Sequence, residues 1–217
     1  ALAGDQDVRA LASRLLDLRS PKQRCSCWGY NFDWQTRTYL VPRGTPNIVC
    51  TTFAANALLD AYDAYGDPAW LEAAQSAGVF LLEGLHITRD ADTLCFSYTP
   101  LVASEVHNAS LLGAALLARL HTYSVIRGMD YNEPSPRPSP IGWERVARHA
   151  GEVRGTVSSV PPTSPSGSSE DFRSAAVAAT SYALKRQRPD GSWPYGEGAK
   201  QRDRKSTRLN SSHGKLS

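Results

Sequence analysis

Three short segments of the chain place two aromatic residues one position apart, which is a pattern suited to holding a sugar. The pairs are Phe32 and Trp34, Phe96 and Tyr98, and Trp193 and Tyr195. In an extended segment, side chains two positions apart point to the same side, so each segment can present two rings together. Apolar C–H faces of sugars pack on aromatic rings, while Tyr hydroxyls and Trp N–H groups donate hydrogen bonds. The pattern predicts a ligand-binding rim.

Further residues extend this predicted binding set. Trp28 and Tyr30 alternate with the first pair, so one strand face could carry four rings. Arg37 follows closely and could pair with a uronate or a phosphate. An alternative is that the rings close the ends of helical hairpins as part of the core. The predicted substrate-binding residues are Trp28, Tyr30, Trp34, Arg37, Asn47, Tyr98, Asn108, Trp193, Tyr195 and Glu197.

Three residues are candidates for catalysis. Glu105 and His107 lie near the predicted start of a helix, where backbone N–H groups favour anions, so they could transfer protons in a lyase or an epimerase. Asp33 lies among the rings and, with Glu197, could provide the two carboxylates that a glycosidase needs. The structural alternatives are that His107 is a hydrogen-bonded helix-start residue and that Asp33 caps a turn.

Other kinds of chemistry have no matching motif. The sequence has no Gly-rich phosphate loop, no Cys-x-x-Cys pair, no His-Glu-x-x-His and no Gly-x-Ser-x-Gly, so we predict no cofactor and no metal. Cys25 and Cys27 are too close together to pair easily, and Cys50 and Cys95 lie in apolar surroundings, which favours reduced thiols in a cytoplasmic protein over a disulfide or metal site. No apolar run is long enough to span a membrane.

Helical periodicity predicts the elements that must position these residues. Apolar spacing predicts helices over 6–19, 47–65 and 68–86, with Gly66-Asp67-Pro68 ending one helix and starting the next. Ser104 is the expected cap of another helix, with the inner helices of the fold at 47–65 and 103–123. Helical spacing returns from Phe172 to Gln187.

Two segments lack this helical periodicity. Residues 133–170 are rich in Pro, Ser and Gly, which predicts a disordered insertion, with a binding linker as the alternative. Residues 203–217 resemble a translated sequencing-library adapter, so we interpret them as a non-native tail on a gene fragment. This tail contains Arg204, Lys205, Arg208 and Lys215 against Asp203, which accounts for the whole formal charge of +3. We therefore expect no nucleic-acid partner.

Without the insertion, the ring pairs recur about every 60 residues, the length of one helical hairpin with its connection. Residues 27–35 (CWGYNFDWQ), 45–47 (TPN), 105–108 (EVHN) and 190–197 (DGSWPYGE) resemble a bacterial family of the α/α-toroid, or six-hairpin glycosidase-like, superfamily, encoded beside polysaccharide-biosynthesis genes. The resemblance covers roughly residues 7–125 and 170–201. It implies a carbohydrate-related function.

The sequence thus predicts an all-α fold, a partial α/α toroid that forms an open arc because it is truncated. The predicted parts are hairpins in 1–132, the insertion 133–170, a continuation in 171–202 and the tail 203–217. The expected function is binding or processing of a bacterial polysaccharide or its precursor, by a hydrolase, lyase or epimerase if the whole protein is an enzyme, with this fragment inactive. One alternative is a noncatalytic α-solenoid scaffold for a protein partner. Another is a terpene-cyclase-like α/α barrel, because residues 187–193 (QRPDGSW) match a repeat of those enzymes.

Overall fold

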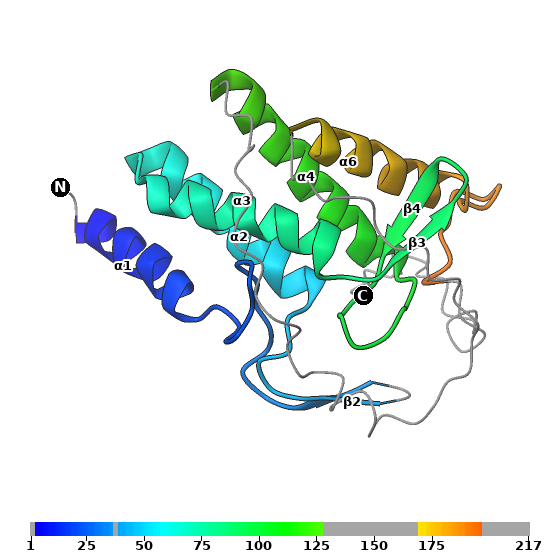
Figure 1. The fold of residues 1–217 in the computed structure, drawn as a ribbon, viewed down its shortest axis with the longest axis horizontal. Coiled ribbons are helices and arrows are strands. Elements are labelled where there is room, and N and C mark those ends of the chain that lie inside the picture. The colour runs from blue at the N-terminus through cyan, green and yellow to red at the C-terminus, as the bar shows by residue number, and fades with distance from the viewer. Residues whose placement is uncertain (1–2, 37–38, 128–168, 197–217) are drawn as a thin grey trace, which may run out of the picture.

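The computed structural model describes residues 3–36, 39–127 and 169–196 (Figure 1). Within these ranges the chain forms five helices and two small sheets, each of two antiparallel strands. The helices are α1 (Ala3–Asp17), α2 (Ile48–Tyr65), α3 (Pro68–Glu83), α4 (His107–Arg127) and α6 (Ser169–Leu184). The strands are β1 (Trp34–Gln35), β2 (Leu40–Val41), β3 (Ile87–Asp90) and β4 (Thr93–Phe96).

The prediction of an all-α toroid is wrong, because the fold is mixed and contains two β-hairpins. In the larger hairpin, Ile87 pairs with Phe96 and Asp90 pairs with Thr93 across a tight turn. All four residues of β4 are buried, so the strand lacks the alternation of apolar and polar residues that reveals a strand in a sequence. The sequence had presented this stretch only as a connection between helices.

The predicted boundary between the second and third helices is confirmed. Asn47 caps α2 by accepting a hydrogen bond from the Cys50 backbone N–H at 2.8 Å. Gly66 ends that helix in the left-handed conformation, with φ of 74°. Asp67 then caps α3, and Pro68 occupies the first helical position. Short polar caps, glycine and proline act through local geometry, which explains why these limits could be read from sequence.

The predicted cap at Ser104 is wrong, because α4 begins three residues later, at His107. The Ser104 hydroxyl instead accepts a hydrogen bond from the Tyr98 backbone N–H at 3.2 Å. Ser104 therefore stabilises the loop that carries Tyr98 rather than the helix. This matters for function because the same loop brings Tyr98 to the first aromatic segment.

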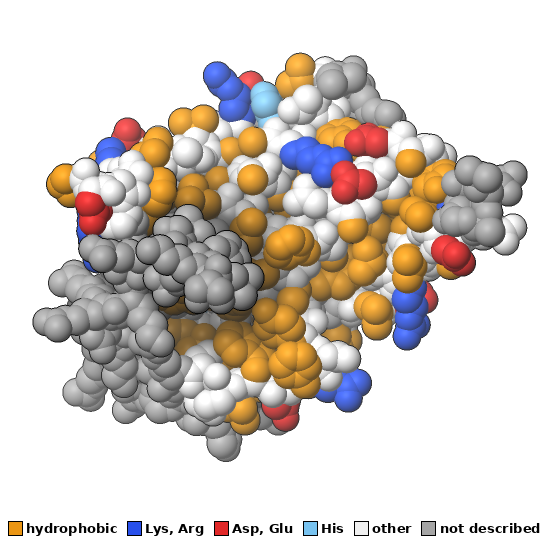
Figure 2. Space-filling model, turned by 180° about the vertical axis from the view of Figure 1, so that it is seen from behind, with side chains coloured by type: hydrophobic (Ala, Val, Ile, Leu, Met, Phe, Trp, Pro, Cys, Tyr) orange, Lys and Arg blue, Asp and Glu red, His pale blue; other side chains and the backbone are white. Residues whose placement is uncertain are grey.

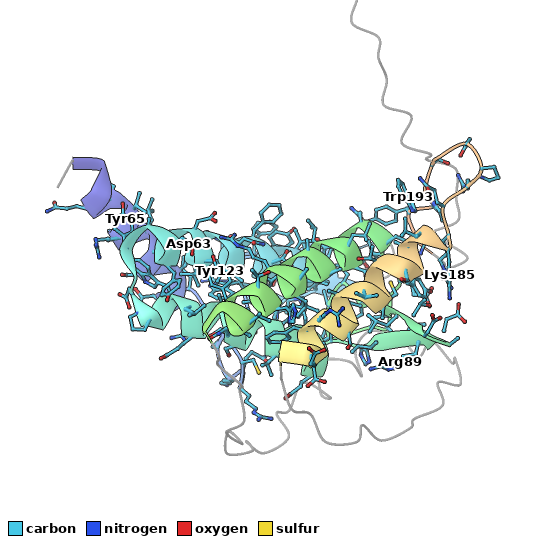
Figure 3. All side chains as sticks on the ribbon, turned by 90° about the horizontal axis from the view of Figure 1, so that it is seen from above. Asp63, Tyr65, Arg89, Tyr123, Lys185 and Trp193 are labelled. Carbon is cyan, nitrogen blue, oxygen red and sulfur yellow. The ribbon has the colours of Figure 1, made fainter. Side chains whose placement is uncertain are left out.

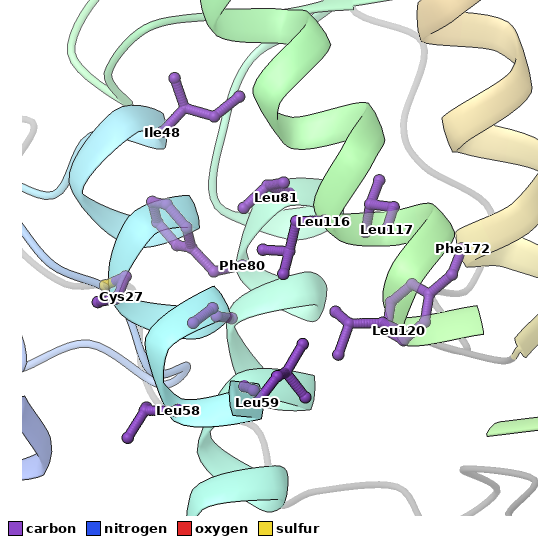
Figure 4. Packing of buried hydrophobic residues seen from close by; sticks show 14 of the residues in the cluster. Cys27, Ile48, Leu58, Leu59, Phe80, Leu81, Leu116, Leu117, Leu120 and Phe172 are labelled. Atoms are coloured by element: carbon purple, nitrogen blue, oxygen red, sulfur yellow. The ribbon is translucent and has the colours of Figure 1, made fainter. Parts of the chain in front are cut away.

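The hydrophobic core lies between α2, α3, α4 and α6 (Figure 4). Leu81 of α3, Leu116 and Leu120 of α4, and Phe172 of α6 are all almost completely buried there. The helices before and after the predicted insertion therefore share one core. Most of the predicted insertion 133–170 and all of the predicted tail 203–217 lie outside the described residues. None of the described helices combines the length and apolar character needed to cross a bilayer.

Candidate functional site

Four aromatic side chains form a contact group beside the start of α2, and we call them the ring cluster: Tyr30, Phe32, Trp34 and Tyr98. Tyr30 stacks on Phe32 with a centroid distance of 5.3 Å and an interplanar angle of 18°. Trp34 meets Tyr30 edge to face at 5.7 Å, and it meets Tyr98 at the same centroid distance. Rings from the first and second predicted pairs therefore come together.

Close backbone packing holds the first segment in place. A Cβ atom on Gly29 would lie 2.0 Å from the carbonyl oxygen of Thr45, so only glycine fits there. The Trp28 carbonyl accepts the Asn47 N–H at 2.9 Å, and the Tyr30 carbonyl accepts the Gly44 N–H at 2.8 Å. These contacts fix Tyr30 next to the N-terminal end of α2.

The second segment is tied to the same helix end. The backbone N–H of Ile48 donates to the Tyr98 carbonyl at 3.0 Å, and the hydroxyls of Tyr30 and Tyr98 lie 3.3 Å apart. Burial is the main cause that raises the pKa of Tyr98, and its neighbours Tyr30, Cys50 and Tyr195 raise it further. The Tyr98 hydroxyl is therefore neutral at physiological pH and can donate a hydrogen bond.

The ring cluster is partly open to solvent. Phe32 is 55% exposed, and Tyr30, Trp34 and Tyr98 are half-buried. Within the described ranges, the Nε1–H of Trp34 has no hydrogen-bond partner, although the indoles of Trp28 and Trp193 both have one. Exposed ring faces together with an available N–H group are what sugar recognition needs.

Trp28 does not join the other three rings of its segment. It is only 4% exposed, and its Nε1–H donates to the Leu15 carbonyl of α1 at 2.8 Å. Phe96, the partner of Tyr98 in the second pair, is completely buried in the core. In both segments the prediction that alternate rings share one face fails, because one ring of the segment turns into the core.

The two rings of the third segment differ in their contacts. Trp193 packs at the end of α6, where its Nε1–H donates to the Ala183 carbonyl at 3.0 Å (Figure 3). Tyr195 is 56% exposed and lies close enough to Tyr98 to influence its pKa. Of this pair, therefore, Trp193 is held by α6, and no ring contact joins Tyr195 to the ring cluster in the described residues.

The two polar catalytic candidates at the start of α4 meet the same tyrosine, and we call the group Glu105, His107 and Tyr182 the polar clasp. The Tyr182 hydroxyl donates to Glu105 Oε2 at 2.9 Å, and its ring meets the His107 imidazole at 5.9 Å. His107 is 2% exposed, and its Nδ1 lies 3.0 Å from the carbonyl oxygen of Pro194. The clasp joins α4, α6 and the segment around Pro194.

The other predicted site residues have varied positions. Asp33 is exposed, and its carboxylate accepts the Arg43 backbone N–H at 2.6 Å, which is a turn-capping role. Asn47 is buried as the cap of α2, and Asn108 is exposed on the first turn of α4. Arg37 and Glu197 lie outside the described residues.

The four cysteines are free. Burial raises the pKa of Cys25 to about 11, that of Cys27 to about 12 and that of Cys95 to about 11, so these thiols stay protonated at neutral pH. In the described part of the chain, no group of three or more His, Cys, Asp or Glu residues is arranged to hold a metal ion. The thiols therefore act as small apolar groups.

A polar network on α2 and α4 was not anticipated from the sequence. The Arg119 guanidinium contacts Asp60 at 2.6 Å, Asp63 at 3.3 Å and Asn56 Oδ1 at 3.0 Å, and the Tyr123 hydroxyl donates to Asp63 (Figure 3). The two aspartates are three residues apart, and Arg119 and Tyr123 are four residues apart, so each pair lies on one helix face. This spacing was the signal available in the sequence. Because its members bond to one another, we interpret the network as a helix-to-helix contact.

Comparison with known protein families, with curated proteins and with solved structures gave no match. The site must be interpreted from its own geometry. Gly29 and Cys50 also belong to it, although no sequence motif indicated a function for them. Gly29 lies between the predicted binding residues Trp28 and Tyr30. A glycine at such a position can indicate that the backbone passes close to another segment, and this was the signal available in the sequence.

Proposed function

We propose that the ring cluster binds carbohydrate, in keeping with the expected role in bacterial polysaccharide metabolism. One observation carries the proposal: the Trp34 indole N–H has no partner in the described residues and Phe32 of the same cluster is exposed, whereas Trp28 and Trp193 use their N–H groups on backbone carbonyls. A sugar can stack on the exposed rings and accept a hydrogen bond from this N–H.

The proposed role is binding rather than catalysis by the predicted residues. Glu105 accepts a hydrogen bond from Tyr182, and His107 contacts the Pro194 carbonyl within a buried setting. Asp33 caps a turn. Each candidate for proton transfer thus has a structural role that accounts for its position. The free, protonated thiols fit a reducing compartment, and we propose a cytoplasmic location on that ground.

A glycan array tests the proposal. We expect the full chain to bind a subset of oligosaccharides and the Trp34→Ala variant to lose that binding. Trp34→Phe keeps a ring but removes the N–H, so it should bind the same glycans more weakly. Val177→Ala is the matched control, because Val177 is an exposed apolar residue on α6, on the other side of α4 from β2 (Figure 1). Unaltered binding by Trp34→Ala would refute the proposal.

A protein-binding scaffold is the second candidate, and exposed apolar side chains on the helices favour it. Hydrophobic side chains cover much of the face seen in Figure 2. Large apolar side chains that remain exposed on helices include Phe53 of α2, Val125 of α4 and Val177 of α6. Exposed apolar surface of this kind is typical of interaction sites. Absence of any glycan binding, together with a partner whose binding is lost in Phe53→Ala, would favour this function.

A further inference from the structure

The second and third aromatic segments are anchored to the same stretch of chain, the one that leads into α4. The backbone N–H of Tyr98 donates to the Ser104 hydroxyl at 3.2 Å, and the backbone N–H of His107 donates to the Tyr195 carbonyl at 3.2 Å. Ser104 and His107 are three residues apart, and such a length of chain spans at most about 11 Å. These contacts therefore hold the two tyrosines near each other.

The side chains of these two tyrosines are also near each other. Burial is the main cause that raises the pKa of Tyr98, Tyr30 follows, and Cys50 and Tyr195 raise it further. An influence of Tyr195 on this pKa requires proximity, because the interaction between charged groups weakens with distance and is screened by salt. Tyr98 is thus a neighbour both of Tyr195 and of Trp34, whose ring it meets at a centroid distance of 5.7 Å.

The Tyr195 ring is exposed although its segment is firmly attached. Tyr195 is 56% exposed. The attachment uses other atoms: the carbonyl oxygens of Pro194 and Tyr195 contact His107, and an antiparallel β-bridge joins Val106 to Gly196. An exposed ring on an anchored backbone can stack on a sugar while losing little conformational freedom.

We propose that Tyr195 forms a second sugar-binding subsite beside the ring cluster, so that the site binds an oligosaccharide chain rather than a single sugar. This inference rests on the proposed function and specifies the length of the ligand. One sugar stacks on the ring cluster, where Phe32 is 55% exposed, and another sugar of the same chain stacks on Tyr195. Because the two sugars are linked, the second contact adds affinity without a second loss of translational freedom.

Oligosaccharides of increasing length test this inference in the full chain. The probes are oligomers of glucose, galactose, mannose and N-acetylglucosamine, from the monosaccharide to the pentamer, titrated at neutral pH and followed by NMR, which also measures weak binding. In a series that binds, we expect the pentamer to bind at least about tenfold tighter than the monosaccharide. Tyr195→Ala should remove this gain and leave the affinity for the monosaccharide unchanged.

Two further variants serve as controls. Tyr195→Phe keeps the stacking surface, so most of the gain with length should remain. Val177→Ala changes an exposed residue of α6 and should match the unaltered chain at every length. The ring-proton signals of Tyr195, assigned with Tyr195→Phe, give a measurement that does not depend on how well the alanine variant folds. They should shift with the pentamer and stay in place with the monosaccharide.

The possible failures of the two proposals are distinguishable. Equal affinity along a series whose binding is lost in Trp34→Ala would overturn the second subsite and leave the carbohydrate function standing. A gain with length that persists in Tyr195→Ala, or Tyr195 signals that ignore the pentamer, would have the same meaning. Binding of no oligomer would overturn both proposals. Binding that survives in a folded Trp34→Ala variant would move the ligand away from the ring cluster and overturn both as well.

Discussion

The ring cluster and the polar clasp both contain tyrosine, but they differ in how their polar atoms are used. In the clasp, the Tyr182 hydroxyl is bound to Glu105, and His107 is buried against Pro194. In the ring cluster, Phe32 is mostly exposed and the Trp34 N–H has no partner in the described residues. A polar side chain near a helix start is a candidate for ligand binding when its polar atom is not already used in holding the fold.

The same contrast occurs within one segment, between Trp28 and Trp34, and predicts a large difference in stability between their variants. Trp28→Ala should lower the free energy of unfolding by about 3–5 kcal/mol, because it empties a buried site and removes the hydrogen bond to Leu15. Trp34→Ala should cost only about 1 kcal/mol, since that ring is half-buried. Urea denaturation followed by circular dichroism measures both. Equal losses would show that Trp34 is a core residue too.

The next prediction concerns His107 of the polar clasp. We expect His107→Ala to lower the free energy of unfolding by about 2 kcal/mol, because the contact with Pro194 and the packing on Tyr182 are lost. Asn108→Ala is the neighbouring control, and this exposed residue should change stability by less than about 0.5 kcal/mol. Glycan binding should persist in both variants. A stable His107→Ala protein that has lost binding would place His107 in the site.

Two cysteines report on the two regions with a smaller, kinetic effect. Cys50 is half-buried next to Tyr30 and Tyr98, whereas Cys95 is 1% exposed and lies near Glu105 of the clasp. Burial raises the pKa of both thiols, so labelling by iodoacetamide should accelerate with rising pH, and Cys50 should react first. Peptide mass spectrometry gives the two rates. A bound oligosaccharide should slow Cys50 alone, and faster labelling of Cys95 would contradict the assignment.

The helices could be predicted because their limits depend on a few adjacent residues. Gly66, Asp67 and Pro68 each act through local backbone geometry, and the structure uses them as expected, whereas Asn47, predicted to bind substrate, caps α2. The strand pair ending at Phe96 was missed because burial on both faces removes the alternation that identifies strands. Local patterns therefore predicted most helices but not the fold class.

The site was predicted only in part, because its assembly depends on contacts between distant residues. Alternation placed Tyr30 and Trp34 together, and the structure confirms their contact. The same pattern did not reveal that Trp28 turns into the core, nor that Tyr98 joins the cluster through the Ile48 N–H. Such pairings depend on the packing of the hairpin against α2, which a periodic pattern does not encode.

The most direct test of the central claim follows the indole N–H signals of the full chain by 1H–15N NMR during titration with a neutral oligosaccharide selected on the glycan array. The Trp34 signal, assigned with Trp34→Phe, should shift progressively as the sugar accepts its N–H. The Trp28 and Trp193 signals should stay in place, because their N–H groups are bound to Leu15 and Ala183. A Trp34 signal that does not move while the sugar binds would contradict the assignment of the ring cluster as the binding site.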